Sequence, residues 1–357
     1  MKKLRFGFLS TANIGRKNWL AAFNAGNCVV SAVASRDVDR SRKFISDCQG
    51  KVPFETAPAA FGSYDELLKS KDVDAVYVPM PTGLRKDYVI RAAEAGKHVL
   101  CEKPCASNVA ELEEMLAACK KHNVQFMDGV MFMHSRRLGQ IRAVLDDKKS
   151  VGRIKRIASQ FSFCGSDEFH SSNIRVDPKL EPLGCLGDLG WYCIRFTLWT
   201  MNWQMPERVE AKILSRAPGS DVPTEFSAEL FFKGGVSASF YCSFLTSGQQ
   251  WATISGTNGC LYVSDFVLPF HKDELNFEVR DERLVIDGCD FRMQPGAQRF
   301  PVAEHSNSHS GAQESNMFRA FADQVISGKL NDDWPMWALR TQQVVEMCVK
   351  DALNRKI

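Results

Sequence analysis

The sequence lacks the long apolar and like-charged segments that membrane, secreted and nucleic-acid-binding proteins carry. No stretch approaches the roughly 18 apolar residues of a membrane span, and the apolar run Phe6–Leu9 is shorter than the ~7–15 residues of a signal-peptide core. Basic and acidic residues nearly balance, 45 against 42, which disfavours nucleic acid and membrane surfaces as partners. We therefore expect a soluble cytoplasmic protein.

Paired metal-ligand or redox cysteines are also absent. The 12 cysteines include no Cys-x-x-Cys pair, so neither a zinc ribbon nor a thioredoxin-type site is expected. Most of them lie among apolar neighbours and predict buried free thiols in a reduced compartment. His305 and His309 are four residues apart, but they lie in a Ser/Asn-rich segment without a nearby cysteine, so no metal site is expected.

The length of 357 residues predicts two domains. Residues 1–128 alternate apolar strands with helical segments, which predicts right-handed βαβ units and a doubly wound parallel sheet of α/β class. The expected strands are Leu4–Leu9, Cys28–Ala34, Val73–Val78, His98–Cys101 and Val124–Met127. The expected helices are Ile14–Asn24, Asp39–Cys48, Tyr64–Lys69, Leu84–Ala95 and Val109–Lys121.

Residues 129–357 predict an α+β domain with a large, mainly antiparallel open sheet. Turn signals such as Lys233-Gly234-Gly235 separate its alternating segments. A helix is expected over 313–327, and a last amphipathic helix over 336–353 is placed to pack back on the first domain. The expected strands are Arg153–Phe163, Arg208–Leu214, Ser227–Phe232, Val236–Phe244, Trp251–Ser255, Leu261–Val263, Leu275–Val279 and Arg283–Ile286.

The turn after the first strand resembles a dinucleotide-binding loop. Aligned with Gly-x-Gly-x-x-Gly, the three glycine positions are Ser10, Ala12 and Gly15. Only the third glycine remains, but Ser10 and Ala12 are small enough to admit a pyrophosphate at the helix N-terminus, where free amides favour anions. The candidate cofactor-binding residues here are Ser10, Thr11, Ala12, Asn13, Ile14 and Gly15.

The end of the second strand reads Ala34-Ser35-Arg36-Asp37. A hydroxyl followed by a guanidinium suits the 2′-phosphate of NADP, because arginine offers a bidentate fork to phosphate oxygens. Asp37 leaves NAD as the runner-up, since an acidic residue at this point can hold the ribose diol or merely cap the next helix. Ser35 and Arg36 are therefore predicted to select NADP.

The strand His98–Cys101 ends in Glu102-Lys103-Pro104. Ligands of open parallel sheets bind beyond the carboxyl ends of the strands, so Lys103 is an amine placed where cofactor and substrate would meet. An exposed loop lysine is the alternative reading.

These segments resemble the glucose–fructose oxidoreductase / inositol dehydrogenase / rhizopine catabolism (Gfo/Idh/MocA) family over nearly the whole chain. The resemblance rests on Pro79-Met80-Pro81, on Lys97 to Pro104 with its Glu-Lys-Pro signature, and on the turn Ser255 to Gly259. Thr82 and Arg85 depart from the asparagine and histidine that many members carry. The resemblance implies further cofactor contacts at Pro79, Pro81, Thr82, Glu102 and Lys103.

The family's downstream motif is matched by the segment from Gly187 to Tyr192. Asp188 and Tyr192 are four residues apart and share one face of a helix. Tyr192 stands where many members have histidine, which is similar to the dimeric dihydrodiol dehydrogenase branch, where tyrosine is assigned as acid/base. The alternative is an aromatic core residue beside Trp191.

The resemblance implies an NADP-dependent oxidoreductase that moves a hydride to or from a polyhydroxylated or cyclic alcohol or carbonyl. Lys103 and Tyr192 would handle the proton, with Asp188 holding Lys103 or a substrate hydroxyl. His134 and Arg175 are candidate substrate contacts, and a homodimer through the second-domain sheet is implied. The alternatives are a non-catalytic nucleotide-binding sensor or scaffold, and a ring reductase similar to biliverdin reductases.

Overall fold

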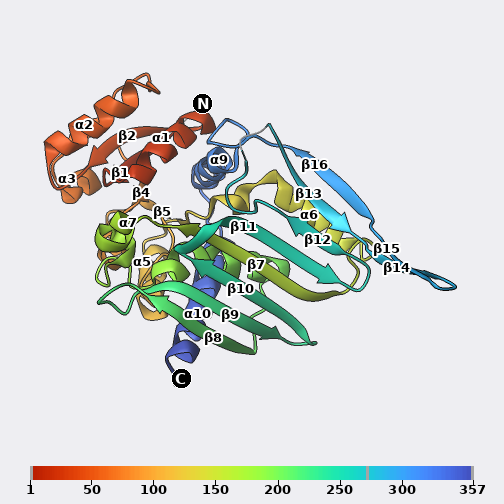
Figure 1. Ribbon diagram of the computed structural model, residues 1–357. Helices are drawn as coiled ribbons and strands as arrows, with labels where there is room; N and C mark the ends of the chain where they lie inside the picture. The colour runs from red at the N-terminus through yellow and green to blue at the C-terminus, as the bar shows by residue number, and fades with distance from the viewer. Residues whose placement is uncertain (1–2, 271–272, 355–357) are drawn as a thin grey trace.

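The computed structural model describes residues 3–270 and 273–354 and builds them around two large β-sheets (Figure 1). The first sheet is parallel throughout, with the strand order β3-β2-β1-β4-β5-β6. Its strands are β1 (Leu4–Leu9), β2 (Cys28–Ala34), β3 (Ala59–Phe61), β4 (Ala75–Val78), β5 (His98–Cys101) and β6 (Phe126–Asp128). The predicted parallel sheet is confirmed, with β3 as a short strand that the sequence pattern does not predict.

Helices cover this sheet, which is why its strands are nearly continuous apolar runs. They are α1 (Asn13–Ala25), α2 (Val38–Gln49), α3 (Tyr64–Lys69), α4 (Thr82–Glu94) and α5 (Val109–Lys121). The side chains of Asp37 and Ser63 cap α2 and α3 by accepting backbone N–H bonds. The strand order reverses between β1 and β4, so the crevice for a ligand lies at their carboxyl ends.

The second sheet has eight strands in the order β16-β13-β12-β11-β7-β10-β9-β8. Only the β7–β10 pair is parallel, so the predicted mainly antiparallel sheet is confirmed. Its strands are β7 (Ile154–Cys164), β8 (Arg208–Arg216), β9 (Pro223–Phe232), β10 (Val236–Ser243), β11 (Leu245–Gly256), β12 (Cys260–Val263), β13 (Glu274–Arg280) and β16 (Ala297–Ala303).

One face of this sheet is covered by α6 (Arg136–Asp146), α8 (Trp191–Thr200) and α10 (Asp333–Asn354). Alternating residues on β9, such as Phe226 and Leu230, are buried beneath these helices. The opposite face carries no helix within the described ranges (Figure 1). The sheet is therefore open on one side.

The segment expected as the strand Arg283–Ile286 is not part of either large sheet. Strand β14 (Arg283–Asp287) pairs with β15 (Asp290–Gln294) in a separate hairpin. The chain leaves the sheet at the end of β13 and returns to it only at β16, so these residues cannot reach a sheet partner. Strands β15 and β16 were not predicted.

Two late helices connect the sheets. Helix α9 (Gln313–Ile326) lies on the first sheet, with Phe318 and Phe321 against Phe6 at ring-centroid distances of 5.3 and 5.6 Å. Helix α10 lies against α5 and β6. The boundary at residue 128 stays a prediction, but α9 belongs to the second part of the chain and covers the first sheet. Among the described residues, no helix has the length and apolar character that a bilayer crossing requires.

Candidate functional site

A cavity of about 1250 Å³ opens at the carboxyl ends of β1, β4 and β5, where the first sheet meets the second. The first sheet contributes the turns that follow these three strands. The second contributes residues of β7, β11 and α8 and of the segment between β7 and α8. The lining includes Ala12, Asn13, Ile14, Pro79, Pro81, Glu102, Lys103, Phe161, Phe163, Arg175, Asp188, Tyr192 and Trp251.

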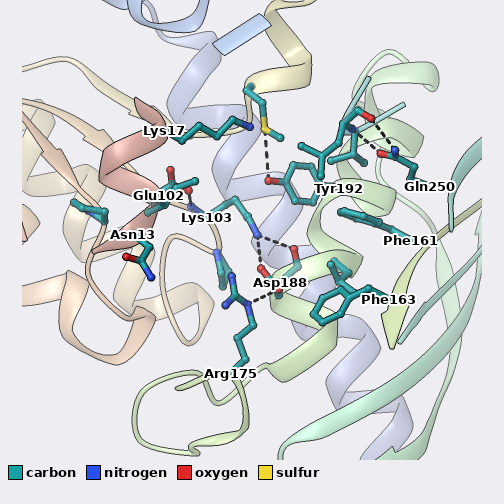
Figure 2. A pocket seen from close by; sticks show the side chains of 18 of the residues that line it. Asn13, Lys17, Glu102, Lys103, Phe161, Phe163, Arg175, Asp188, Tyr192 and Gln250 are labelled. Carbon is teal, nitrogen blue, oxygen red and sulfur yellow. Dashed lines mark hydrogen bonds and ion pairs between the residues drawn. The ribbon is translucent and has the colours of Figure 1, made fainter. Parts of the chain in front are cut away.

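Lys103, Asp188 and Arg175 form a connected ion-pair network in this cavity (Figure 2). The Nζ of Lys103 donates to Oδ1 of Asp188 at 2.6 Å and to its main-chain oxygen at 2.7 Å, while Nε of Arg175 donates to Oδ2 at 2.6 Å. Burial opposes the charged form of Asp188, but the two cations outweigh it and hold the pKa of this carboxyl well below its usual range. Asp188 is therefore an anion that orients the Lys103 amine.

Tyr192 lies beside the lysine. Its ring centroid is 4.7 Å from Nζ of Lys103. Among the described residues its hydroxyl donates only to Sδ of Met131, a weak acceptor, at 3.6 Å. Burial, with the negative charges of Glu102 and Asp188, raises the pKa of Tyr192 well above its usual value. The ring packs against Phe161 at 5.6 Å, so Tyr192 is a core aromatic residue that also presents a protonated hydroxyl to the cavity.

The helix that carries these groups begins irregularly. Leu186–Gly190 form a π-helical turn (η3) that continues into α8, and such turns often occur at functional sites. A Cβ on Gly187 would lie 3.0 Å from Cγ of Pro104. The absence of a side chain at Gly187 lets the turn approach the Glu102–Pro104 corner, and the Asp188 main-chain oxygen thereby comes within reach of Lys103.

Glu102, in the wall of the cavity, is held by a buried hydrogen-bond network. Its Oε1 accepts from the hydroxyl of Tyr77 at 2.6 Å and from Nδ2 of Asn18 at 3.3 Å. Asn18 also donates to the Tyr77 hydroxyl at 2.6 Å. These contacts fix the residue that precedes Lys103, and they join β4, β5 and α1 under the site.

The turn after β1 has the shape of a phosphate-binding loop despite its substitutions. Ser10 adopts φ 143°, a conformation that favours glycine, and its Oγ accepts from the Ala12 amide at 3.0 Å. A Cβ on Gly15 would lie 3.2 Å from Cζ of Phe44, as helix–sheet packing at the third glycine predicts. Ala12, Asn13 and Ile14 line the cavity, whereas Ser10, Thr11 and Gly15 belong to the same turn but not to the lining.

The residues at the end of β2 lie farther along the same edge of the sheet and outside the cavity lining. Ser35 is buried, and its hydroxyl donates to the main-chain oxygen of Asp37 at 2.5 Å. The Asp37 carboxylate accepts from the Asp39 amide at 2.9 Å and caps α2. Arg36 is exposed.

Thr82 and Arg85, the two residues that differ from the family pattern, both make hydrogen bonds that join segments of the fold. Thr82 does not line the cavity: its hydroxyl is buried and donates to Oε2 of Glu181 at 2.5 Å, which links α4 to the second half of the chain. Arg85 is buried and donates to the main-chain oxygens of Met80 and Pro104. Arg85 thus braces the ends of β4 and β5 on which Lys103 depends.

The contact of His134 with substrate stays a prediction; the residue is not part of the cavity lining. The 3-10 helix Met131–His134 (η1) places the ring against Trp334 of α10, at a centroid distance of 6.3 Å. Burial, together with the positive charge of Arg195, lowers the pKa of His134 to about 4. The His134 ring packs against α10 and is neutral in the folded protein at neutral pH.

This pKa predicts a pH-dependent contribution to stability. The unfolded chain binds a proton at His134 near pH 6.5 and the folded chain only near pH 4, so the contribution is complete above pH 6.5 and is lost as the pH falls toward 4. We expect the wild type to lose up to about 3 kcal/mol more of its unfolding free energy over this interval than His134→Gln does. Urea unfolding at pH 7 and pH 4.5 measures this, and equal losses in both proteins would contradict it.

Several lining residues escaped prediction. Lys17 lies one helical turn after Asn13 and pairs with Glu314 of α9 at 2.7 Å, and the i,i+4 spacing alone could have identified it. Phe161 and Phe163 lie across the cavity from Lys103 (Figure 2), and Gln250, which pairs with Phe161, lies on the same face of the sheet. Their strand alternation predicts a face but not which face meets the cavity. Among the described residues, no cluster of three metal-ligating side chains occurs.

Two protein-family models match the sequence. An oxidoreductase family with an NAD-binding Rossmann fold (GFO_IDH_MocA) matches residues 4–130, and the GFO/IDH/MocA C-terminal domain matches residues 139–262. The two matches fall on the parallel sheet and on the chain from α6 to β12.

Curated relatives are dehydrogenases and reductases. D-xylose 1-dehydrogenase (NADP(+)) 2 from Haloferax volcanii is 34% identical over 265 residues, which cover 72% of this chain and 75% of the relative. Trans-1,2-dihydrobenzene-1,2-diol dehydrogenase from Xenopus tropicalis is 31% identical over 234 residues, 66% of each chain. A dTDP-3,4-didehydro-2,6-dideoxy-alpha-D-glucose 3-reductase from Actinomadura kijaniata is 29% identical over 351 residues, covering 96% of this chain and 94% of the relative.

Solved structures extend the similarity over the whole fold. A 3-ketoreductase from Actinomadura kijaniata, in complex with NADP and TDP-benzene, has a TM-score of 0.83 and 26% identity over 98% of each chain. An aldose–aldose oxidoreductase from Caulobacter crescentus has a TM-score of 0.80 at 21% identity, over 99% of this chain and 98% of that one. At that identity the second match supports the fold alone.

Proposed function

Because the chain belongs to the Gfo/Idh/MocA family of oxidoreductases, we propose that it is an NADP-dependent enzyme acting on a polyhydroxylated or cyclic alcohol or carbonyl, such as a sugar or a dihydrodiol. The convergence of Lys103, Asp188 and Tyr192 in one cavity, next to the turn after β1, carries the proposal. The xylose and dihydrodiol dehydrogenases among its relatives support the substrate class.

The residues at the edge of the first sheet fit a nicotinamide dinucleotide. No side chain of the described residues caps the start of α1, so the amides of Asn13 and Ile14 would face a pyrophosphate, and Ser10 and Ala12 are small enough to admit it. Arg36 would hold the 2′-phosphate at the end of β2, and Pro79 and Pro81 would border the nicotinamide. The cofactor supplies a hydride donor or acceptor carbon.

The side chains of the cavity would then control the proton on the substrate oxygen. Tyr192 holds a hydroxyl proton with only a weak acceptor nearby, so it suits the acid role in carbonyl reduction. Lys103 would hydrogen-bond the same oxygen, and Asp188 would hold its amine in place. Phe161 and Phe163 would exclude water from one side of the substrate.

Titration with NADPH and NADH, followed by the absorbance of the reduced nicotinamide across sugars, inositols, dihydrodiols and dicarbonyls, tests this function. We expect NADPH to bind and at least one of these classes to be turned over. Failure to bind either nucleotide would remove the enzyme assignment. Binding without turnover on any class would favour a nucleotide sensor.

Arg36 supplies a separate test of the cofactor. Arg36→Ala should weaken NADPH binding about 10- to 100-fold, the loss expected for a charged hydrogen bond to phosphate, and change NADH binding far less. Arg40→Ala, an exposed arginine of α2, is the matched control and should leave both affinities unchanged. Fluorescence titration of the wild type and both variants measures the six dissociation constants, and an equal effect of Arg36→Ala on both nucleotides would overturn the NADP preference.

We also propose a homodimer through the open face of the second sheet and a reduced cytoplasmic setting. On the open face, Arg156 pairs with Glu229 and donates to the hydroxyls of Ser237 and Ser239. Phe231 and Tyr241 lie on the same face as Ser237 and Ser239, and this mixture of polar and aromatic side chains suits face-to-face packing. All 12 cysteines are free thiols, which fits a reducing compartment.

A further inference from the structure

The hairpin β14–β15 stands apart from the rest of the protein. Its two strands pair only with each other and project beyond the end of the second sheet (Figure 1). Nine of its ten strand residues are exposed, and Val285 is half-buried. Because its residues are exposed, the hairpin gains little stabilisation from contacts with the rest of the protein. An isolated two-stranded hairpin is only marginally stable in water.

One face of the hairpin is apolar and uncovered. Leu284 lies opposite Met293, and Ile286 lies opposite Phe291, which places all four side chains on one face. These side chains are 56%, 59%, 57% and 65% exposed, in that order. The other face carries Arg283, Asp287, Asp290 and Arg292 around Val285. An amphipathic ribbon of this kind has the composition of an interface element.

Strand β14 has a free edge with a self-complementary sequence. It reads Arg283-Leu284-Val285-Ile286-Asp287, and within the described ranges its outer edge pairs with no strand. If a second copy lies antiparallel with Val285 opposite Val285, Arg283 faces Asp287 of that copy and Leu284 faces its Ile286. The pairs on one face are then all apolar. On the other face, an apolar pair of valines lies between two pairs of opposite charge.

We propose that β14 pairs with β14 of a second copy of this chain across a two-fold axis at Val285. The two hairpins form one four-stranded antiparallel sheet, and the free edge of each β14 is removed. The alternative edge is less suitable, because pairing β15 with itself about its central residue places Arg292 opposite Arg292. A contact between five-residue strands is smaller than a stable interface requires, so the association depends on concentration and is distinct from pairing through the open sheet face.

A charge exchange tests the proposed register. Arg283→Asp and Asp287→Arg each place like charges opposite one another twice in the dimer, and we expect each to weaken this association about tenfold. The double variant restores opposite charges and should recover the wild-type affinity. Arg292→Glu, on the same face but on β15, outside the contact between the two β14 strands, is the control. Sedimentation velocity over a concentration series measures all five proteins.

Cross-linking provides a positive signal that does not depend on any other interface. Val285→Cys, made with Cys164→Ser and Cys289→Ser to remove the two exposed thiols, places two cysteines opposite each other at disulfide distance. We expect oxidation to yield a covalent dimer, whereas Asp290→Cys in the same background should not cross-link. A double charge variant as weak as the single ones, or absence of the Val285→Cys cross-link, would overturn the proposal. A heterologous protein or a lipid surface would then be the remaining occupant of the apolar face.

Discussion

Replacing Lys103 by methionine is expected to lower kcat by at least about 1,000-fold while leaving NADPH affinity within a few-fold of the wild type. Methionine keeps the length and apolar stem of lysine but cannot donate to Asp188 or to a substrate oxygen. The loss should therefore fall on the chemical step and not on nucleotide binding. NADPH titration and steady-state kinetics on the same preparation separate the two effects.

The control for this variant is a lysine outside the cavity. Lys86 lies on α4 and pairs with Glu114 on α5, so Lys86→Met removes one positive charge without touching the site. We expect wild-type kcat from Lys86→Met. Equal activity of Lys103→Met and the wild type would exclude Lys103 from the reaction.

The second large effect concerns stability. Arg195 is fully buried on α8; its guanidinium bonds both oxygens of Asp128, at 3.2 and 2.5 Å, and its Nε donates to Thr341 of α10 at 2.7 Å. Asp128→Ala would leave the Arg195 charge buried without its carboxylate, and we expect a loss of about 3–5 kcal/mol in the free energy of unfolding. Urea unfolding at neutral pH measures it.

Two comparisons isolate the buried charge as the cause. The double variant Asp128→Leu/Arg195→Met removes both charges, so it should be more stable than Asp128→Ala. Asp39→Ala removes an exposed partner of Arg42, and its effect should stay within about 0.5 kcal/mol. If Asp128→Ala costs no more than Asp39→Ala, the Arg195–Asp128 pair does not hold the two sheets together.

The position of Lys103 could be predicted from the sequence because it depends on local patterns. An apolar strand that ends in a charged corner, in a series of strands and helices, places that corner at one edge of a parallel sheet. The proximity of Tyr192 could not be predicted in this way. It depends on how the second sheet packs on the first, and only the family resemblance indicated it.

Other features depend on contacts between distant segments. Arg175 was expected near the substrate, but its pairing with Asp188 depends on the path of an irregular segment with no periodic pattern. His134 follows a strand at the correct edge, yet the 3-10 turn directs its ring to α10. The hairpin β14–β15 has an alternating pattern typical of a sheet strand, and the pattern does not reveal that, in the described part of the chain, no third strand lies beside it.

The π-turn at Leu186–Gly190 makes the site sensitive to chain length as well as to residue type. A π-turn holds one more residue per turn than the α-helix that follows it, so removal of one residue would let α8 continue as a regular helix. Every residue before the deletion would then rotate by about 100° about the helix axis. The Asp188 carboxylate would turn away from Lys103 although both residues were still present. A related sequence that has lost one residue at this turn would therefore be inactive, even if it retained every motif residue.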